Sequence, residues 1–499
     1  MMKNVITYLL LLLLTACIPT PHDIRMAEVP LTMYPDYQDV TIPCNIAPLN
    51  FLLRGDYTAV NLRVEGKDHS IVEQSCRGAK LVFRKDVWQQ IVSQNLNDSA
   101  VVTICAEKDG QWWQLPSFKW YISADSIDAY ITYRLIEPGY EVWDKVCIEE
   151  RCIENFETRL LADGNELGNR CMNCHTHGGD KGQYSFFHLR GEKGGTILNR
   201  DGKLRKVTLK TPDMKSGTVY GDWHPSGQYA VFSGNVIIPA FHTVKSRRLE
   251  VYDTMSDLCV ADFDHNKILL PAVADDTSNS FETFPCFSAD GRSIFFCSAP
   301  NPCGDTIPSA RDLEDHIQEL HYSLCRIDFN PEDGTFGTKV DTLYNARLEG
   351  GSANYPKCSA DGKYLCFTRS DHGTFPIWHQ EATLCFISLQ DSTLTTANTT
   401  LIDSQENGTY HTWSHNSKWL AFASKRADGQ YGRVHFIHIG NEYNKINLSK
   451  PLTLPQEDPE MDDWNLRSYN IPDLSTQPMS FGQKDIKTLL EQVLAEIFQ

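Results

Sequence analysis

Residues 286–298 read CFSADGRSIFFCS, and residues 357–369 read KCSADGKYLCFTR. Each stretch begins as a strand, turns at Ser-Ala-Asp-Gly and continues as a second, largely apolar strand. The Asp-Gly pairs at 290 and 361 supply the positive φ that a two-residue hairpin turn needs. The second strand has little apolar–polar alternation, which predicts burial on both of its faces. The two stretches therefore predict a mainly β protein that is built from repeated hairpins.

Two further copies extend the repeat along the chain. Residues 223–233 read WHPSGQYAVFS, with Ser226-Gly227 in the turn, and residues 412–424 read TWSHNSKWLAFAS, with Asn416-Ser417 in the turn. The copies are roughly 55 to 70 residues apart, which leaves room for four strands and their loops in each repeat. One four-stranded blade cannot bury its own faces, so the repeats must stack around an axis. This predicts a β-propeller over residues 184–450.

The repeat resembles a known family. The Ser-x-Asp-Gly-Lys/Arg turn, followed by an aromatic-rich strand, is similar to the repeat of TolB-type propellers, and the similar region covers over half the chain. The first and last repeats are faint in the sequence. The resemblance implies about six blades, with five or seven left open.

The N-terminus has the pattern of an export signal. Lys3 precedes an apolar run over residues 5–14, which is too short to span a bilayer and has the proportions of a secretory signal. Residues 14–17 read LTAC and resemble the bacterial lipobox, which implies cleavage before Cys17 and attachment of lipid to it. An ordinary signal peptide is the alternative. A lipidated Cys17 would hold the protein on a membrane. Ile18 stands where an Asp would retain a lipoprotein at the inner membrane, so this resemblance implies the outer membrane, facing the periplasm.

The strongest chemical motif is Cys171-Met172-Asn173-Cys174-His175. Two thiols at this spacing reach the two vinyl groups of one haem, and the adjacent imidazole reaches the iron. The motif predicts one covalent haem c, with thioether bonds to Cys171 and Cys174 and His175 as the proximal iron ligand. Export agrees with this prediction, because bacterial c-type haem is attached outside the cytoplasm.

Other interpretations of the motif stay open. A zinc site of Cys171, Cys174, His175 and His177 is one, although adjacent histidines suit tetrahedral spacing poorly. A thioredoxin-like redox pair is another, although no βαβ pattern surrounds it. The distal haem ligand is not part of the motif. Five downstream residues are candidates: His177, His188, Met214, His224 and His242.

Outside the propeller, the sequence predicts five segments. Residues 1–16 form the signal peptide, and residues 17–33 form a tether. Residues 34–125 form a small β domain, with an immunoglobulin-like sandwich as the working model. Residues 126–183 form a connector that carries the haem motif. Residues 451–499 form a tail that wraps the propeller and ends in a helix, whose apolar stripe from Ile486 to Ile497 packs on the core.

The net charge and the cysteine content limit the classes of partner that the sequence predicts. The formal net charge of -18 argues against nucleic acid as a partner, because phosphates would be repelled. The sequence has 16 cysteines. Within that set, Cys147 with Cys152, and Cys297 with Cys303, are close enough for local disulfides in an oxidising periplasm. The predicted partners are a lipid membrane and an unidentified redox or cell-envelope protein.

An exported CxxCH motif ahead of propeller repeats resembles a group of TolB-like lipoproteins described as cytochrome c or cytochrome c biogenesis proteins. Residues 133–140, 190–196 and 468–472 share in that resemblance. It implies electron transfer or redox sensing, with the propeller as a docking surface. The alternative is a non-catalytic scaffold that binds proteins or ligands in the cell envelope. An enzyme is the less favoured class, because the sequence has neither a Gly-x-Ser-x-Gly motif nor a following hydrolase domain.

Overall fold

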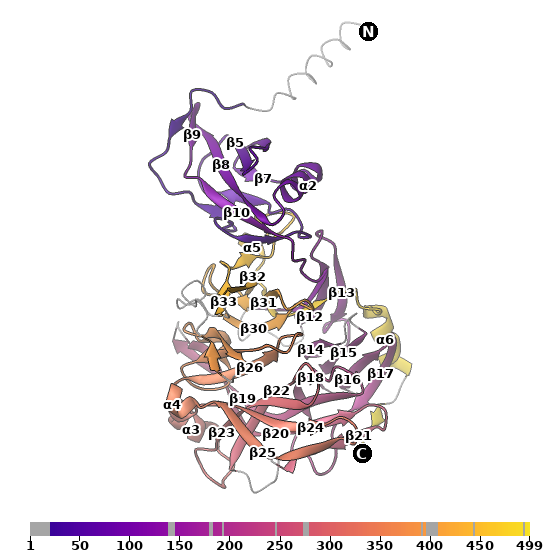
Figure 1. The fold of residues 1–499 in the computed structure, drawn as a ribbon. Coiled ribbons are helices and arrows are strands. Elements are labelled where there is room, and N and C mark those ends of the chain that lie inside the picture. The colour runs from indigo at the N-terminus through magenta and orange to yellow at the C-terminus, as the bar shows by residue number, and fades with distance from the viewer. Residues whose placement is uncertain are drawn as a thin grey trace. The chain divides into compact units, whose positions relative to one another are not determined.

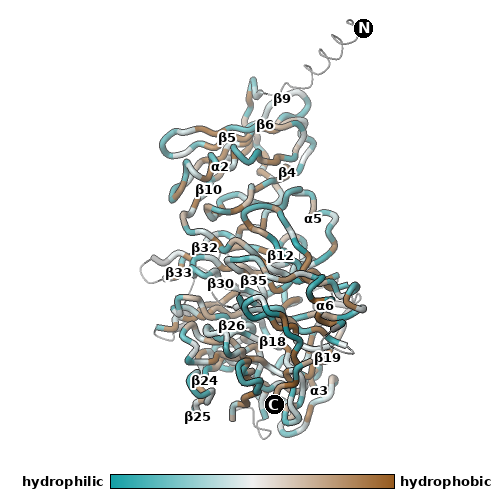
Figure 2. Tube along the Cα trace, turned by 90° about the vertical axis from the view of Figure 1, so that its right-hand side faces the viewer, coloured by the Kyte–Doolittle hydropathy of each residue, from teal (hydrophilic) through white to brown (hydrophobic). Residues whose placement is uncertain are grey.

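The computed structural model describes residues 20–137, 145–178, 183–191, 194–244, 247–272, 279–390, 393–395, 408–442, 445–492 and 495–499. The signal segment and Cys17 lie outside these residues. The chain divides into two compact units, one of residues 1–126 and 452–465 and one of residues 127–451 and 466–499 (Figure 1). Hydrophobic stretches in both units are short and separated by hydrophilic ones (Figure 2). Within the described part of the chain, no helix has the length and apolarity needed to cross a membrane.

The first unit has two sheets. The strands of the larger sheet are β1 (Arg25–Met26), β3 (Thr41–Pro43), β5 (Ala59–Gly66), β6 (Ile71–Arg77), β8 (Asp98–Lys108), β9 (Gln111–Gln114) and β10 (Phe118–Ser123). The strands of the smaller sheet are β2 (Met33–Tyr34), β4 (Phe51–Leu53) and β7 (Lys80–Leu81). Burial alternates along β5, as expected for a strand with one face on a core.

A helix in the first unit was missing from the strand-only prediction. Helix α2 (Lys85–Gln94) buries Val87, Trp88, Ile91 and Val92, which share one helical face. The indole nitrogen of Trp88 donates to the carbonyl of Ile46 at 3.0 Å. Two strand pairs of the larger sheet, β1 with β9 and β10 with β3, are parallel. The working model of a sandwich made only of strands is therefore corrected to a sheet structure with a packed helix.

The predicted tail also needs correction. Residues 452–465, which contain β34 (Leu452–Thr453) and α5 (Met461–Trp464), belong to the first unit. The side-chain amide of Asn50 donates to the carbonyls of Gln456 and Glu457. Arg54 forms a bidentate ion pair with Asp463. These polar bonds hold the returning segment within this unit. The composition of the segment alone could not reveal its partners.

The second unit contains six sheets with a common plan among the described residues. The first is ordered β13 (Thr158–Asp163), β12 (Cys147–Cys152), β11 (Tyr130–Ile136), β35 (Ser468–Ser475). The second is β14 (Met172–Gly178), β15 (Tyr184–Leu189), β16 (Gly195–Arg200), β17 (Lys203–Thr208), β36 (Glu496–Ile497). The third is β18 (Thr218–Trp223), β19 (Tyr229–Val244), β20 (Arg247–Asp262), β21 (Lys267–Leu269).

The remaining three sheets follow in chain order. The fourth is β22 (Ser280–Phe287), β23 (Ser293–Pro300), β24 (Ser323–Asn330), β25 (Thr335–Tyr344). The fifth is β26 (Ser352–Cys358), β27 (Tyr364–Ser370), β28 (Thr383–Ser388), β29 (Thr393–Thr395). The sixth contains β30 (Gly408–Trp413), β31 (Trp419–Ser424), β32 (Arg433–Glu442), β33 (Lys445–Leu448). Short helices α3 (Ala310–His316), η3 (Ile317–Glu319), α4 (Ala346–Glu349) and η4 (Pro376–Trp378) lie between strands.

The innermost strands of these sheets form a ring. Strand β14 contacts β18, which contacts β22, and the contacts continue through β26 and β30 to β35 and back to β14. Strand β35 comes from near the C-terminus and pairs with β11, so an early and a late part of the chain share one sheet. The second unit is a β-propeller, as the repeats predicted.

The structure corrects where the propeller begins. The sequence predicted a connector over residues 126–183, but β11, β12 and β13 form one propeller sheet and β14 opens the next. No Ser-x-Asp-Gly turn joins these strands in the sequence, so the repeat did not predict them. Their burial still fits a stacked sheet, since Ile131, Tyr133 and Leu135 are all buried. The haem motif consequently lies on an innermost strand of the propeller.

The repeated turn is longer than predicted. Ser288 and Ser293 bond through their backbones, and the amide of Gly291 donates to the carbonyl of Ser288 at 2.9 Å. The hydroxyl of Ser288 donates to Asp290 at 2.6 Å. Gly291 has a φ of 70°, so the positive φ prediction is confirmed. The two-residue hairpin is wrong, because the Ser–Asp side-chain bond organises a wider loop.

Burial and the C-terminus give mixed outcomes. Every residue of β30 and β31 is buried, which confirms strands covered on both faces.

Helix α6 (Gln483–Gln492) packs Ile486 into a core cluster with Phe187 and Ile197, as predicted. Ile497, however, lies in β36 and is 72% exposed, so the helical stripe ends earlier than predicted. Residues 493 and 494 lie outside the described residues. The described cysteines form no disulfide, so Cys147 is not joined to Cys152, nor Cys297 to Cys303, in this structure.

Candidate functional site

A β-bulge recurs on the innermost strands of the propeller. The pairing register shifts between Asn173 and Thr176 on β14, and between Asn354 and Lys357 on β26. At a bulge, two residues oppose one on the neighbouring strand, so consecutive side chains can face the same side. The other four inner strands have a register shift at the corresponding place.

One residue from each bulge surrounds the propeller axis. These residues are Cys174, Tyr220, Phe284, Tyr355, Tyr410 and Ile471, and all six line one cavity. All except Tyr220 have φ between 45° and 56°, in the left-handed region that is uncommon for residues other than glycine. Five strands carry a large side chain here, whereas β14 carries a thiol. Cys174 therefore makes β14 the exception in the ring.

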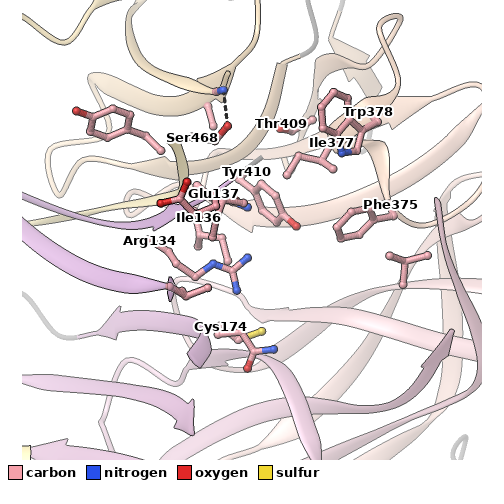
Figure 3. Close-up of a pocket in the computed structure, with 18 of the residues that line it drawn as sticks. Arg134, Ile136, Glu137, Cys174, Phe375, Ile377, Trp378, Thr409, Tyr410 and Ser468 are labelled. Carbon is pink, nitrogen blue, oxygen red and sulfur yellow. Dashed lines mark hydrogen bonds between the residues drawn. The ribbon is translucent and has the colours of Figure 1, made fainter. Parts of the chain in front are cut away.

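Two cavities meet at this ring. Cys174, Tyr220, Tyr410 and Ile471 line both of them. The larger cavity has a volume of about 170 Å³ and the smaller about 70 Å³. Figure 3 shows Cys174, Arg134 and Tyr410 around the larger cavity. The propeller thus contains a polar and aromatic channel beside the haem motif.

The structure brings the three motif residues to this channel. Cys171 and Cys174 line the larger cavity, and Cys174 and His175 line the smaller one. Cys174 is buried and Cys171 is half-buried. Burial raises the pKa of Cys174 to about 11, so its sulfur is a neutral thiol at neutral pH. The bulge explains how a cysteine and the next residue on a strand can both face the axis.

His175 is buried without a good partner. Neither ring nitrogen has a hydrogen bond of good geometry among the described residues. Burial lowers the pKa of His175 to about 3, while Asp473 and the backbone of Thr132 act weakly in the opposite direction. The imidazole is therefore neutral at neutral pH and has a lone pair available for a metal. A buried polar group without a partner is costly, so the position suits a ligand that supplies one.

Two guanidinium groups were not predicted from the sequence. Arg134 on β11 and Arg190 beside β15 line the larger cavity together with Cys174. Both positive charges act on the thiol of Cys174 and favour its ionised form, against the effect of burial. Nothing local in the sequence marks these arginines, because they reach the cavity from two different sheets.

A polar cluster lines the smaller cavity. Lys357 on β26 forms an ion pair with Asp222 on β18. Thr412 on β30 donates to Asp473 on β35 at 3.0 Å, and the backbone nitrogen of His177 donates to the other oxygen of that carboxylate at 2.7 Å. His411 also lines this cavity, and its Nε2 donates to the carbonyl of Cys366 at 3.0 Å. The sequence analysis missed this cluster, although all its strands share a bulge.

The distal-ligand candidates are placed differently from one another. His177 is on β14, with its ring centre 6.2 Å from that of His175, and Nε2 bonds to Thr132. His188 is on β15 and bonds through Nδ1 to the hydroxyl of Thr196 at 2.9 Å. None of the candidates with described side chains lines the two channel cavities.

Two further candidates lie elsewhere, and the third is not described. Both ring nitrogens of His224 have partners, at 2.8 Å from the hydroxyl of Ser226 and 3.2 Å from the carbonyl of Gly291. Met214 packs against a core cluster and lines a separate small cavity. The side chain of His242 lies outside the described residues. The geometry therefore gives His224 and Met214 no contact with the channel cavities.

Comparisons with known proteins found only distant structural likenesses. No family model matches this sequence, and no curated protein matches it. Among solved structures, TolB from Acinetobacter baumannii is similar over 75% of this chain and 79% of its own, with 10% identity and a TM-score of 0.42. A Synechocystis apocarotenoid oxygenase is similar over 87% of this chain and 95% of its own, with 12% identity and a TM-score of 0.38. At TM-scores below 0.5, these likenesses carry no argument about fold or activity.

Proposed function

We propose that this chain is an exported, lipid-anchored, six-bladed propeller that carries one covalent c-type haem in its channel. The haem would transfer electrons to a cell-envelope partner or sense redox state for it. One observation carries the proposal: Cys171, Cys174 and His175 all reach the channel wall, and the nitrogens of the buried His175 have no hydrogen-bond partner among the described residues. Two thiols and a neutral imidazole are the donor set of c-type haem.

The chain's own residues have distinct roles in this proposal. Cys171 and Cys174 would anchor the porphyrin through thioether bonds, and His175 would bind the iron. Arg134 and Arg190 supply positive charge beside the thiols, where acidic porphyrin side chains need counter-charges. When bound, the haem supplies reversible one-electron chemistry at iron.

Room is the main constraint on this fit. The larger cavity of about 170 Å³ is smaller than the ligand sites of about 300–1,000 Å³ found in proteins. Side chains that line it, such as Trp378 and Tyr410, would have to turn away to admit a porphyrin. The proposal therefore requires the haem-loaded channel to be wider than the channel in this structure.

A pyridine haemochrome assay tests the proposal. The full chain is produced in a host that attaches c-type haem, and haem per chain is measured for wild type, Cys171→Ser/Cys174→Ser and Cys303→Ser. We expect one haem in the wild type, none in the double variant, and wild-type content in the control. Cys303 is a suitable control because it lies in a loop after β23, away from the channel. Folded wild type without a thioether haem spectrum would falsify the proposal.

Membrane attachment has its own test. We propose that Cys17 carries lipid and that the protein lies on the periplasmic side of the outer membrane, since the lipobox pattern is independent of the propeller. Cys17→Ala should move the protein from the membrane fraction to the soluble periplasm. Cys44→Ala, a control in the first unit, should remain with the membrane. Equal membrane retention of both variants would contradict lipid anchoring.

The cavity volume favours a second candidate, a haem-free propeller scaffold that binds a small ligand. Aromatic walls and two guanidinium groups suit a compact aromatic anion. The probe is 8-anilinonaphthalene-1-sulfonate with haem-free, folded protein. Saturable binding that Arg134→Met weakens, together with no haem in the preceding assay, would favour the scaffold.

A further inference from the structure

A second cluster of potential metal ligands lies outside the two channel cavities. Glu250 on β20 and two histidines between β27 and β28, His372 and His379, bring one ligand atom each to within 4.8 Å of one another. Their exposed fractions are 0%, 7% and 3%. We propose that these three residues bind a divalent transition-metal ion, with Zn²⁺ as the ion they suit best.

The spacing around His379 matches a coordination sphere. Its Nε2 lies 3.1 and 3.4 Å from the two carboxylate oxygens of Glu250. Nitrogen and oxygen ligands about 2.0–2.2 Å from a tetrahedral zinc are about 3.4 Å from each other. The rings of His372 and His379 have centroids 4.8 Å apart and are inclined by 67°. A small inward movement of His372 therefore completes a three-residue site.

A carboxylate behind His379 orients it for metal binding. Glu381 lies with Oε1 at 2.7 Å from Nδ1 of His379. A carboxylate that accepts the Nδ1 proton fixes the tautomer and leaves the Nε2 lone pair for a metal. The same arrangement without a metal would be an ion pair of a protonated His379 with two carboxylates. Zinc binding distinguishes these two arrangements.

The donor set also selects the metal. Two imidazoles and one carboxylate are the ligands of many zinc sites, and neither sulfur nor an all-oxygen shell is present here. All three residues are buried, so bulk water and large substrates do not reach the ion. This burial, and not the donor set, favours a stabilising zinc site over a catalytic one.

The site lies next to the wall of the larger channel cavity. Phe375, Ile377 and Trp378 line that cavity and lie between the two histidines in sequence. On the opposite side, Val251 follows Glu250 and also lines the cavity, and its carbonyl accepts from the hydroxyl of Thr374 at 3.4 Å. A bound zinc would therefore tie β20 of the third sheet to the wall segment of the fifth sheet. This role does not depend on what the channel holds.

Zinc titration of the full chain tests the proposal. Protein stripped with a chelator is titrated with Zn²⁺ alone, and zinc content and thermal midpoint are measured. We expect one tightly bound zinc per chain and a higher midpoint. His372→Ala should lose this binding, and Glu381→Gln should weaken it about 10- to 100-fold. The control His265→Ala alters an exposed histidine just after β20 and should bind as wild type does.

Two results would overturn the proposal. One is zinc binding of unchanged affinity in a folded His372→Ala protein. The other comes from X-ray absorption at the zinc edge of the wild type, which decides the matter even if the variant fails to fold. We expect nitrogen and oxygen neighbours with two imidazoles, whereas sulfur neighbours would assign the zinc to cysteines. Because the readout is zinc and not iron, failure here leaves the haem proposal untouched.

Discussion

Strands β14 and β26 share one backbone plan and differ in chemistry. Each has an asparagine before the bulge and a left-handed residue within it, Cys174 with φ 56° and Tyr355 with φ 50°. On β26 the side chain at the bulge has a hydrogen-bond partner, because the hydroxyl of Tyr355 donates to the hydroxyl of Tyr410 at 3.0 Å. On β14 a thiol replaces the phenol, and the ring of His175, which follows it, has no well-formed hydrogen bond within the described part of the chain. The comparison shows that the propeller repeat determines where the bulge residue lies, whereas the identity of its side chain determines the chemistry.

The largest expected effect comes from making β14 resemble β26. Cys174→Tyr removes one of the two proposed thioether sulfurs and adds a phenol beside those of Tyr220, Tyr355 and Tyr410, so covalent haem should fall to a small fraction of the wild-type content. The pyridine haemochrome assay measures this content. Cys174→Ser is the smaller matched change and should show the same loss, which separates the missing sulfur from crowding by the new ring. Full haem content in the serine variant would remove Cys174 from the site.

His175→Ala should have the next largest effect. The variant keeps both sulfurs but lacks the proposed iron ligand, so its haem spectrum should lose the form with a protein imidazole bound. Added imidazole should restore that form, since the cavity left by the side chain can admit it. Optical spectra with and without imidazole measure this rescue, with His265→Ala as the control. A spectrum identical to the wild type would exclude His175 as the ligand.

Breaking the ion pair of β26 should affect stability and not haem content. Lys357→Met leaves Asp222 with only the backbone amide of Phe287, at 3.0 Å, as a partner. We expect the free energy of unfolding to fall by about 1–3 kcal/mol, because a charged group loses its hydrogen-bonded partner. Urea unfolding measures the change. The double variant Lys357→Met/Asp222→Asn should recover part of the lost free energy of unfolding. No recovery would argue against a direct interaction between the two residues.

The smallest expected effect comes from Tyr355→Phe. The variant removes one hydroxyl that donates to Tyr410 and leaves the ring in place, so the loss should be about 1 kcal/mol. The urea midpoint should fall slightly with an unchanged slope, and haem content should stay at the wild-type level. A large loss of haem would mean that β26 contributes directly to the haem site. The proposed difference in chemistry between β14 and β26 would then be wrong.

Some of this arrangement could be predicted from sequence and some could not. The apolar strand after each Ser-x-Asp-Gly turn marked a repeated sheet because its lack of alternation indicates two buried faces. The first sheet was missed because β11 pairs with β35, more than three hundred residues later in the chain. Local sequence patterns contain no information on such a pairing. Arg134 was missed for the same reason, because it reaches the channel from β11.

The sequence by itself determined the repeated hairpins, and it predicts export and covalent haem at Cys171, Cys174 and His175, since these patterns depend on neighbouring residues. Only the tertiary structure decided that the motif lies on an innermost propeller strand, with Arg134 beside it. It also decided that Glu250 meets His372 and His379. The physical reason is that closing a ring of sheets brings together side chains whose proximity depends on strand register and bulges, which no local stretch of sequence specifies.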